Sequence, residues 1–439
     1  MPTANPLHPP IPLKAGQLYQ WGNLVGASLG LALSSVIAES PHPVLIVTPD
    51  TLTATRLVYE LQFFHEQHAT HPVIYFSDWE TLPYDHFSPH QDIISERLAA
   101  LYKIPTLKQG AIIISISTLM HRLSPREFLE GNIFLLKEGD TLNIDTTRKR
   151  LEKAGYRCVD QVREHGEFAV RGAIIDLFPM GSHTPYRIDL FDDDIDSIRT
   201  FSPDTQRSLE KINKIELLPA KEFPLNEESI ELFRQKWRSQ FNGNPMNCPM
   251  YQEMSDGICT PGIEYYLPFF FEKTATFFDY LPEKSLLVNI DHLHLKADEF
   301  WREINTRYEQ RANDITRPLI SPREMFVPID DIFSRMKQYT RIKIHSDSLI
   351  ENNTDFNFVT RIPPVLHIDY KATQPLEALQ TFLTHYPGRV LFCAETTGRR
   401  EVLLQLFNTI ELHPTLFSSW ETFLSSNEKY GITVALLET

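Results

Sequence analysis

The sequence predicts an α/β protein: a parallel sheet covered by helices, a smaller α+β domain inserted into it, and a small α/β domain after it. Continuous apolar runs at residues 44–47 and 111–116 alternate with helix-length segments, as expected for strands that are buried on both faces. Between residues 133 and 219, short strand-like pieces alternate with turn-forming glycines instead. A polar, proline-containing stretch at 352–364 then precedes another α/β pattern.

Residues 1–132 and 220–350 are predicted to be the two sequence pieces of the parallel-sheet domain. We place Leu52, Leu57, Leu61 and Phe64 on one side of a helix at 51–64. A buried strand at 285–290 can rejoin the first sheet. The other expected elements are helices at 24–38, 92–102 and 229–240 and strands at 44–48, 73–76 and 111–116.

Residues 133–219 are predicted to form the inserted α+β domain, because Gly139, Gly166 and Gly181 mark turns between short strands. Gly155 ends a short helix. The expected elements are that helix at 148–154, strands at 168–170, 173–178 and 186–190, and a turn at 192–194.

Residues 351–439 are predicted to begin with a linker at 352–364 and to continue as a small α/β domain. The chain stops directly after an apolar strand candidate, so we expect it to be a fragment of a longer protein. Helices are expected at 375–383 and 398–407, and strands at 389–394 and 432–436.

The composition is that of a globular protein, with 42% hydrophobic and 23% charged residues. No secretory or membrane-spanning pattern is present, which predicts a soluble, cytoplasmic chain with no membrane partner. The four cysteines are scattered, so reduced thiols are favoured over a structural zinc site. The net charge of −15 disfavours tight DNA binding by the whole chain, although a local basic patch could still bind.

A glycine-containing run near residue 26 has the outline of a phosphate-binding loop, followed by an apolar helix and an apolar strand. A working loop needs Gly-x-x-x-x-Gly-Lys-Ser/Thr, whose lysine neutralises phosphates and whose hydroxyl holds magnesium. Gly26 and Gly30 are present, but the lysine and the hydroxyl are missing. The sequence therefore predicts a degenerate nucleotide loop with no bound cofactor.

The second half of such a site is a strand that ends in two carboxylates. Here the strand at 286–288 ends in Asn289 and Ile290, followed by Asp291 and His292. An ordinary buried strand explains this segment equally well. Together with the loop, however, it suggests that both halves of one ATPase site are absent, and we predict no catalytic residues.

Two other polar clusters are weaker candidates. The loop at 78–85 carries paired carboxylates among aromatics, and we favour a packed surface loop over a catalytic one. His86 and His90 lack further ligands nearby in the sequence, so no metal site is predicted.

An exposed interface is the remaining candidate. Residues at alternate positions of a strand share a face, so Arg187, Asp189 and Phe191 project together, and Arg171 lies beside a neighbouring strand. Arginine beside an aromatic is a common interface anchor. The pattern alone favours an ordinary arginine–aspartate pair on a solvated sheet over an interface.

Three segments resemble a known family. They are Asp78-Trp79-Glu80-Thr81-Leu82-Pro83-Tyr84-Asp85, the run from Phe87 to Ser95, and the run from Glu167 to Gly181. They are similar to the N-terminal part of the bacterial transcription-repair coupling factors (the Mfd family), and the similarity extends over essentially the whole chain. The resemblance implies a degenerate RecA-like domain similar to UvrB, an inserted UvrA-binding domain, and a small third domain.

The resemblance also implies the site residues and the partners. Two arginines and a phenylalanine that contact UvrA in the family match Arg171, Arg187 and Phe191. The family's RNA polymerase-interaction domain, its ATP- and magnesium-dependent DNA translocase motor, and a C-terminal domain that docks on the UvrA-binding face all lie outside this sequence. We therefore expect a non-enzymatic module that recruits UvrA to stalled transcription complexes during nucleotide excision repair. The alternative is an ATP-dependent helicase or translocase domain with unconventional site residues.

Overall fold

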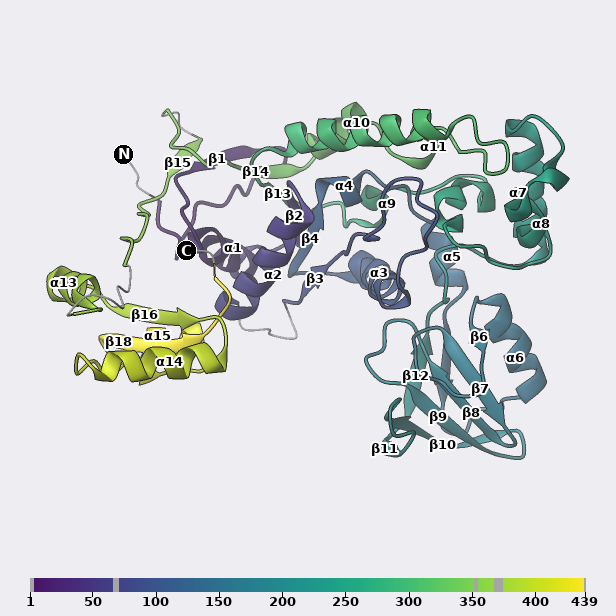
Figure 1. Cartoon of the computed structure of the whole chain (residues 1–439), viewed down its shortest axis with the longest axis horizontal. Coiled ribbons are helices and arrows are strands. Elements are labelled where there is room, and N and C mark those ends of the chain that lie inside the picture. The colour runs from purple at the N-terminus through teal and green to yellow at the C-terminus, as the bar shows by residue number, and fades with distance from the viewer. Residues whose placement is uncertain (1–3, 66–70, 351–353, 367–373, 438–439) are drawn as a thin grey trace.

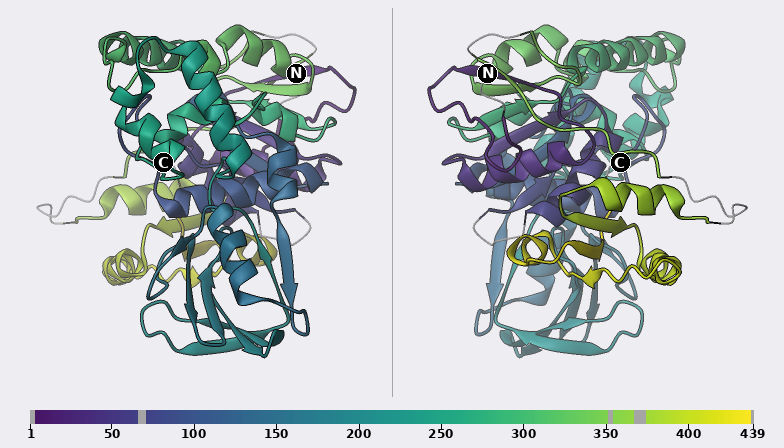
Figure 2. Two further views of the ribbon diagram at one scale, coloured as in Figure 1. Left: turned by 90° about the vertical axis from the view of Figure 1, so that its right-hand side faces the viewer. Right: turned by 90° about the vertical axis from the view of Figure 1, so that its left-hand side faces the viewer.

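The computed structural model describes residues 4–65, 71–350, 354–366 and 374–437 (Figure 1). The described strands form a seven-stranded, a six-stranded, a three-stranded and a two-stranded sheet. The six-stranded sheet projects from the body that contains the seven-stranded sheet, and the three-stranded sheet forms a separate lobe (Figures 1 and 2).

The seven-stranded sheet has the order β15-β1-β14-β13-β2-β4-β3, and every neighbouring pair is parallel. The predicted strand at 285–290 does rejoin the first sheet, because β13 lies between β2 and β14. The predicted strands at 44–48, 73–76 and 111–116 are confirmed to within one residue. The strands are β1 Leu18–Gly22, β2 Val44–Thr48, β3 Val73–Tyr75, β4 Ala111–Ser115, β13 Leu286–Asn289, β14 Thr340–Ile344 and β15 Asp355–Asn357.

Both faces of this sheet are buried, which explains why its central strands are continuously apolar. Val44 and Ile46 of β2 point into one hydrophobic cluster, with α1 (Ser28–Glu39) and α2 (Thr51–Phe64). Leu45 and Val47 point into a larger cluster on the other face.

Helix α2 has the predicted bounds because Asp50 caps it, its Oδ1 accepting from the Thr53 N–H at 2.7 Å. Leu57 and Leu61 are buried as predicted. Placing Leu52 on their side was wrong, since Leu52 is 82% exposed. Leu57 comes five residues after Leu52, which in an α-helix is one full turn plus about 140°. The two side chains therefore lie on different sides of the helix.

The segment predicted as a linker at 352–364 contains part of the main sheet, so that prediction is wrong for the strand it holds. Strand β15 pairs in parallel with β1, and Gln20 donates from Nε2 to Asp355 Oδ1 at 2.9 Å. A three-residue edge strand is too short for its periodicity to show in the sequence.

The insertion begins and ends in one antiparallel pair, β5 (Phe134–Lys137) with β12 (Lys214–Leu217), which brings its two ends together. Between them the six-stranded sheet has the order β11-β10-β9-β8-β7-β6. The helix predicted at 148–154 begins earlier because Asn143 caps it, accepting from the Thr146 N–H at 3.1 Å. The elements are α6 Ile144–Lys153, β6 Arg157–Cys158, β7 Glu167–Arg171, β8 Ile174–Phe178, β9 Tyr186–Phe191, β10 Asp194–Phe201 and β11 Ser208–Ile212.

A buried ion pair joins the exit of the insertion to the first sequence piece. Arg97, on α3 (Gln91–Lys103), donates from Nε to Glu222 Oε1 at 2.8 Å, and both side chains are at most 2% exposed. Trp79 donates from Nε1 to the other carboxylate oxygen at 2.9 Å, and Arg97 Nη1 bonds the Ser77 carbonyl at 2.7 Å.

Helix α3 also holds the six-stranded sheet directly. Nδ1 of His165 lies 2.6 Å from Asp92 Oδ1, and the Gly181 N–H donates to Ser95 Oγ at 2.8 Å. A Cβ atom on Gly181 would lie 3.2 Å from the Ala99 Cβ, so glycine permits this close approach.

The third lobe contains a parallel sheet of order β16-β18-β17, as its α/β pattern predicted. Trp420 of this lobe packs edge-on against Phe64 of α2, with ring centroids 5.3 Å apart. Its elements are α13 Glu377–His385, β16 Val390–Ala394, α14 Thr397–Asn408, β17 Thr415–Leu416, α15 Trp420–Ser425 and β18 Tyr430–Val434.

The remaining helices cover the larger apolar cluster beside the main sheet. Among the residues described above, no helix is both long and apolar enough to cross a membrane. The helices are α4 Ile116–Leu119, α5 Arg126–Gly131, α7 Glu227–Gln240, α8 Pro249–Ser255, α9 Phe277–Tyr280, α10 Leu293–Arg311, α11 Pro322–Met325 and α12 Ile329–Met336, with 3-10 turns at η1 Ile104–Thr106, η2 Pro245–Asn247 and η3 Ile263–Phe270.

The substitution Glu222→Ala should lower the free energy of unfolding by about 3–5 kcal/mol, because it leaves the Arg97 guanidinium buried without a counter-charge. Urea denaturation followed by tryptophan fluorescence measures the loss. The control is Glu152→Ala, which removes an exposed carboxylate paired with Arg148 and should cost less than about 1 kcal/mol. Equal losses in the two variants would contradict this prediction.

Burial lowers the pKa of His121 to about 4, from 6.5 for the free side chain. As the pH falls, His121 of the unfolded chain therefore binds a proton near pH 6.5, whereas His121 of the folded chain binds one only near pH 4. The free energy of unfolding should fall across this window by roughly 3 kcal/mol. In His121→Phe this contribution should vanish, so denaturation curves at pH 7 and pH 5 should lie closer together than in the parent; equal separations would refute it.

Candidate functional site

The glycine loop, residues 23–27, connects β1 to α1 at the edge where the parallel strands end. Gly26 has a positive φ of 54°. Thr360 lies against this loop: its Oγ1 accepts from the Val25 N–H at 3.2 Å and donates to the Asn23 carbonyl. The Asn23 side chain also donates to the Phe358 carbonyl at 2.7 Å. The segment that follows β15 therefore occupies polar groups of the loop.

Gly30 lies within α1 and serves helix packing. A Cβ atom at this position would lie 2.6 Å from the Glu60 Cβ, so only glycine lets α1 and α2 approach this closely. No local pattern in the sequence indicates this role, because Glu60 comes from another helix.

At the end of β13, Asn289 and Ile290 occupy the positions where carboxylates were sought. Ile290 is buried in an apolar cluster, and the Asn289 Oδ1 is buried with no hydrogen-bond partner among the residues that the structure describes. Asp291 accepts from the Ser346 N–H at 3.0 Å and from the His292 N–H at 2.8 Å. Burial alone would raise the pKa of Asp291, but these bonds outweigh it and lower that pKa.

The loop at 78–85 is packed, as we favoured. Trp79 and Tyr84 are buried, and Asp78 Oδ2 accepts from Thr118 Oγ1 at 2.7 Å. His86 contacts Arg317, and His90 caps α3. Within the described part of the chain, no three His, Cys, Asp or Glu side chains are placed to hold a metal ion.

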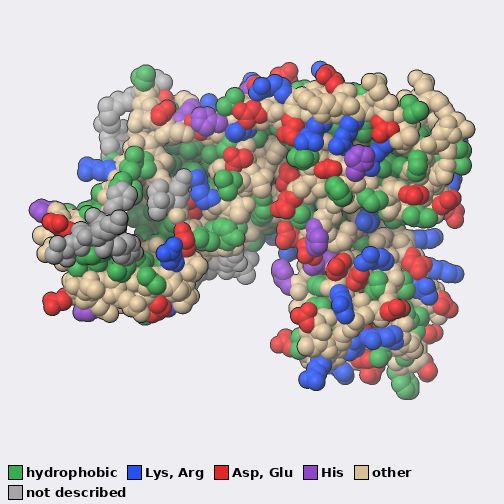
Figure 3. All heavy atoms as spheres, viewed as in Figure 1, with side chains coloured by type: hydrophobic (Ala, Val, Ile, Leu, Met, Phe, Trp, Pro, Cys, Tyr) green, Lys and Arg blue, Asp and Glu red, His purple; other side chains and the backbone are tan. Residues whose placement is uncertain are grey.

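The three predicted interface residues lie on one sheet, in the projecting lobe. Arg171 ends β7, and β9 carries both Arg187 and Phe191. Phe191 is 74% exposed, next to the turn in which Asp192 has a φ of 54°. Basic and acidic side chains are interspersed over the visible side of this lobe (Figure 3).

Arg171 and Arg187 meet at one carboxylate, that of Asp176 in β8. Arg187 donates from Nε to Oδ1 at 2.7 Å and from Nη2 to Oδ2 at 2.9 Å, and Arg171 Nη2 also bonds Oδ2. Asp176 is fully buried. Its hydrogen bond raises the pKa of Arg187.

Asp176 was not predicted as a site residue, although strand alternation indicates its position. Ile175 and Leu177 flank it and are buried in the main core, so strand alternation places Asp176 on the opposite face with Arg187. Strand alternation grouped Arg187 with Asp189, whereas Asp189 accepts from Ser197 Oγ at 3.1 Å and lies 3.8 Å from Arg199.

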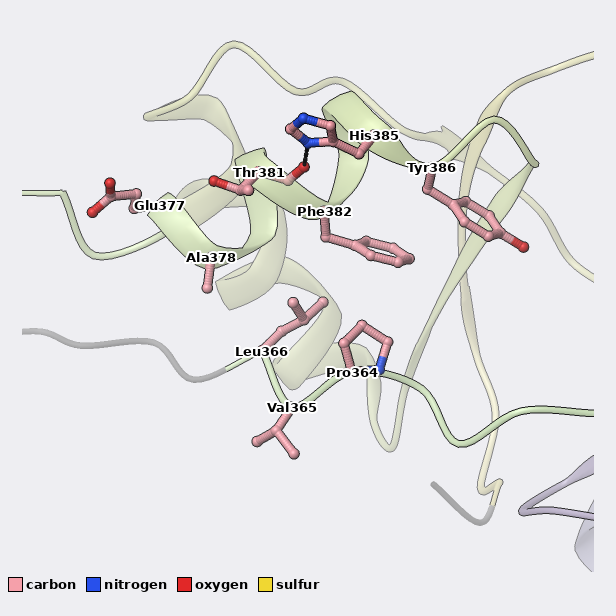
Figure 4. Close-up of a pocket in the computed structure, with 9 residues that line it drawn as sticks. All are labelled: Pro364, Val365, Leu366, Glu377, Ala378, Thr381, Phe382, His385 and Tyr386. Atoms are coloured by element: carbon pink, nitrogen blue, oxygen red, sulfur yellow. Dashed lines mark hydrogen bonds between the residues drawn. The ribbon is translucent and has the colours of Figure 1, made fainter.

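The third lobe contains a groove whose residues are distant in sequence from Arg171, Arg187 and Phe191. Figure 4 shows Phe382 on α13, with Tyr386 directly after the helix, beside the extended segment that includes Pro364 and Leu366. The two rings stack with centroids 5.0 Å apart, and His385 Nδ1 lies 2.8 Å from the Thr381 carbonyl. The groove is mainly apolar and presents no catalytic arrangement of these side chains.

Two family models match the chain. The UvrB interaction domain matches residues 134–223, which include the two-stranded and six-stranded sheets, and the MFD D3 domain matches residues 382–439.

Proteins named transcription-repair-coupling factor match most of the chain. The Haemophilus influenzae protein is 44% identical over 432 residues, which are 98% of this chain and 37% of that protein. The Escherichia coli protein is 42% identical over 405 residues, 92% of this chain and 35% of its own length. The Bacillus subtilis protein is 26% identical over 296 residues. The chain thus spans little more than a third of the Haemophilus influenzae and Escherichia coli proteins and belongs, as the N-terminal part, to the transcription-repair-coupling factor family.

Proposed function

We propose that this chain is the non-catalytic module that recruits UvrA to stalled transcription complexes in transcription-coupled nucleotide excision repair. The observation that carries the proposal is the match of residues 134–223 to the UvrB interaction domain. The exposed residues of that region include Arg171 and Phe191, the side chains expected to contact UvrA.

The contact uses two kinds of interaction. Arg171 and Arg187 place positive charge opposite an acidic partner, with Arg171 the more exposed of the two, and Phe191 supplies an apolar anchor that binding buries. A ring that is 74% exposed gains by leaving water, and the β9–β10 hairpin presents it at the edge of the lobe.

The seven-stranded sheet is, in this proposal, a degenerate RecA-like domain that acts as a scaffold and holds no ATP or magnesium. Three features support this. The loop lacks a lysine, Thr360 occupies its polar groups, and Ile290 stands where a carboxylate is needed. RNA polymerase and DNA are contacted only by downstream domains of the complete protein, and its C-terminal domain docks on the UvrA-binding face.

The double variant Arg171→Ala with Phe191→Ala should lose UvrA binding, because both a charged contact and the apolar anchor are removed. Isothermal titration with purified UvrA measures the affinity, and circular dichroism checks the fold. The matched control is Arg148→Ala with Leu135→Ala, which removes an exposed arginine of α6 and a half-exposed leucine of β5. Unchanged affinity in the first variant would refute the site assignment.

The purified chain should neither bind nor hydrolyse ATP, since it lacks the groups that neutralise the β- and γ-phosphates. Phosphate release and fluorescent-nucleotide titration test this in the presence of magnesium. Turnover that elutes with the chain's own peak in gel filtration would favour the ATP-dependent helicase or translocase alternative.

A further inference from the structure

We propose that Asp176 is a positioning residue for UvrA binding: its buried carboxylate, braced by Arg187, holds the Arg171 guanidinium in place for the partner. This inference rests on the proposed function. It assigns different roles to the two arginines: Arg171 contacts the partner, and Arg187 holds Asp176 in place.

The two arginines differ in what they still offer to a partner. The Arg187 side chain is 15% exposed, and each of its guanidinium nitrogens already has an acceptor. Nε and Nη2 bond Asp176, and Nη1 lies 3.3 Å from both the Gln206 carbonyl and Ser208 Oγ. Its guanidinium also lies over the Phe201 ring, 5.0 Å from the centroid. Arg187 is therefore held in place by these contacts and offers a partner fewer free N–H groups than Arg171.

Arg171 is the more available of the two. Its side chain is 49% exposed, and it is tied to Asp176 through Nη2. Among the described residues, Asp176 is the acceptor that its guanidinium bonds, so its other N–H groups remain available to a partner. A guanidinium that is already fixed loses less conformational entropy on binding than a free one, so its hydrogen bonds contribute more affinity.

The charge of the face indicates an acidic partner surface. Arg199 on β10 lies directly opposite Arg187 and is 46% exposed, and it lies 3.8 Å from Asp189. Three arginines, and Lys211 directly opposite Arg199, thus share this face with three aspartates, Asp176, Asp189 and Asp194, of which Asp176 is fully buried. Like charges on directly opposed strand positions are unfavourable, and an acidic partner would relieve this.

The test is a double-mutant cycle with UvrA on the complete chain. Asp176→Asn keeps the shape of the side chain but removes its charge, so Arg171 is released. We expect Asp176→Asn and Arg171→Ala each to weaken binding about tenfold. The double variant should be no weaker than Arg171→Ala alone, because positioning matters only while Arg171 is present. A purely structural defect would instead add to the loss in Arg171→Ala.

Glu167→Gln is the matched control. Glu167 is a second buried carboxylate of the same sheet, and it accepts from the Arg163 and Glu164 N–H groups at 2.8 and 3.0 Å. This variant should keep the parental affinity. Arg187→Lys serves as a second variant if Asp176→Asn does not fold. Lysine keeps the charge but cannot bind both carboxylate oxygens as arginine does, so affinity should again fall.

The outcomes separate the inference from the proposed function. If the parent binds UvrA and either Asp176→Asn binds equally well or its loss adds fully to that of Arg171→Ala, the positioning role is overturned. Parental affinity in Arg187→Lys would overturn it as well. If the parent does not bind UvrA at all, the proposed function fails, and this inference fails with it.

Discussion

The buried ion pair between Arg97 and Glu222 is the constraint on which the arrangement of the chain depends. An unpaired guanidinium at this depth would be strongly unfavourable, so the fold requires the two residues to meet. Glu222 is reached only after the chain has passed through the insertion. The pair therefore fixes where the insertion returns to the body, and the bond from Trp79 to the same carboxylate holds the neighbouring loop.

This constraint gives the six-stranded sheet a defined position on the main body. Helix α3, which carries Arg97, also contacts the insertion through Asp92 and Ser95. The sheet is thus held along one side, while Phe191 remains exposed at its far hairpin. A rigid attachment of this kind suits a surface that binds a partner, because the sheet loses little conformational entropy on binding. The domain that contains the main sheet provides this attachment, and the attachment does not require nucleotide binding at the glycine loop.

Much of the fold followed from local patterns. Continuous apolar strands predicted a sheet buried on both faces, and the alternate burial of Val44 and Leu45 shows why such strands lack polar positions. The short edge strand β15 was missed because three residues show no period. Leu52 was misplaced because its spacing from Leu57 does not match the helical repeat. For the interface, strand alternation placed Arg187 and Phe191 on one face, but it paired the arginine with the wrong aspartate.

The sequence by itself determined the α/β class, the missing lysine of the glycine loop, and the family, because each depends on residues that are neighbours along the chain. The tertiary structure alone decided what those residues contact. It placed Thr360 on the loop at Val25, Glu60 against Gly30, and Asp176 between two arginines. Each contact joins residues that lie on separate elements, and their distances follow from strand register and helix packing, which no local period encodes.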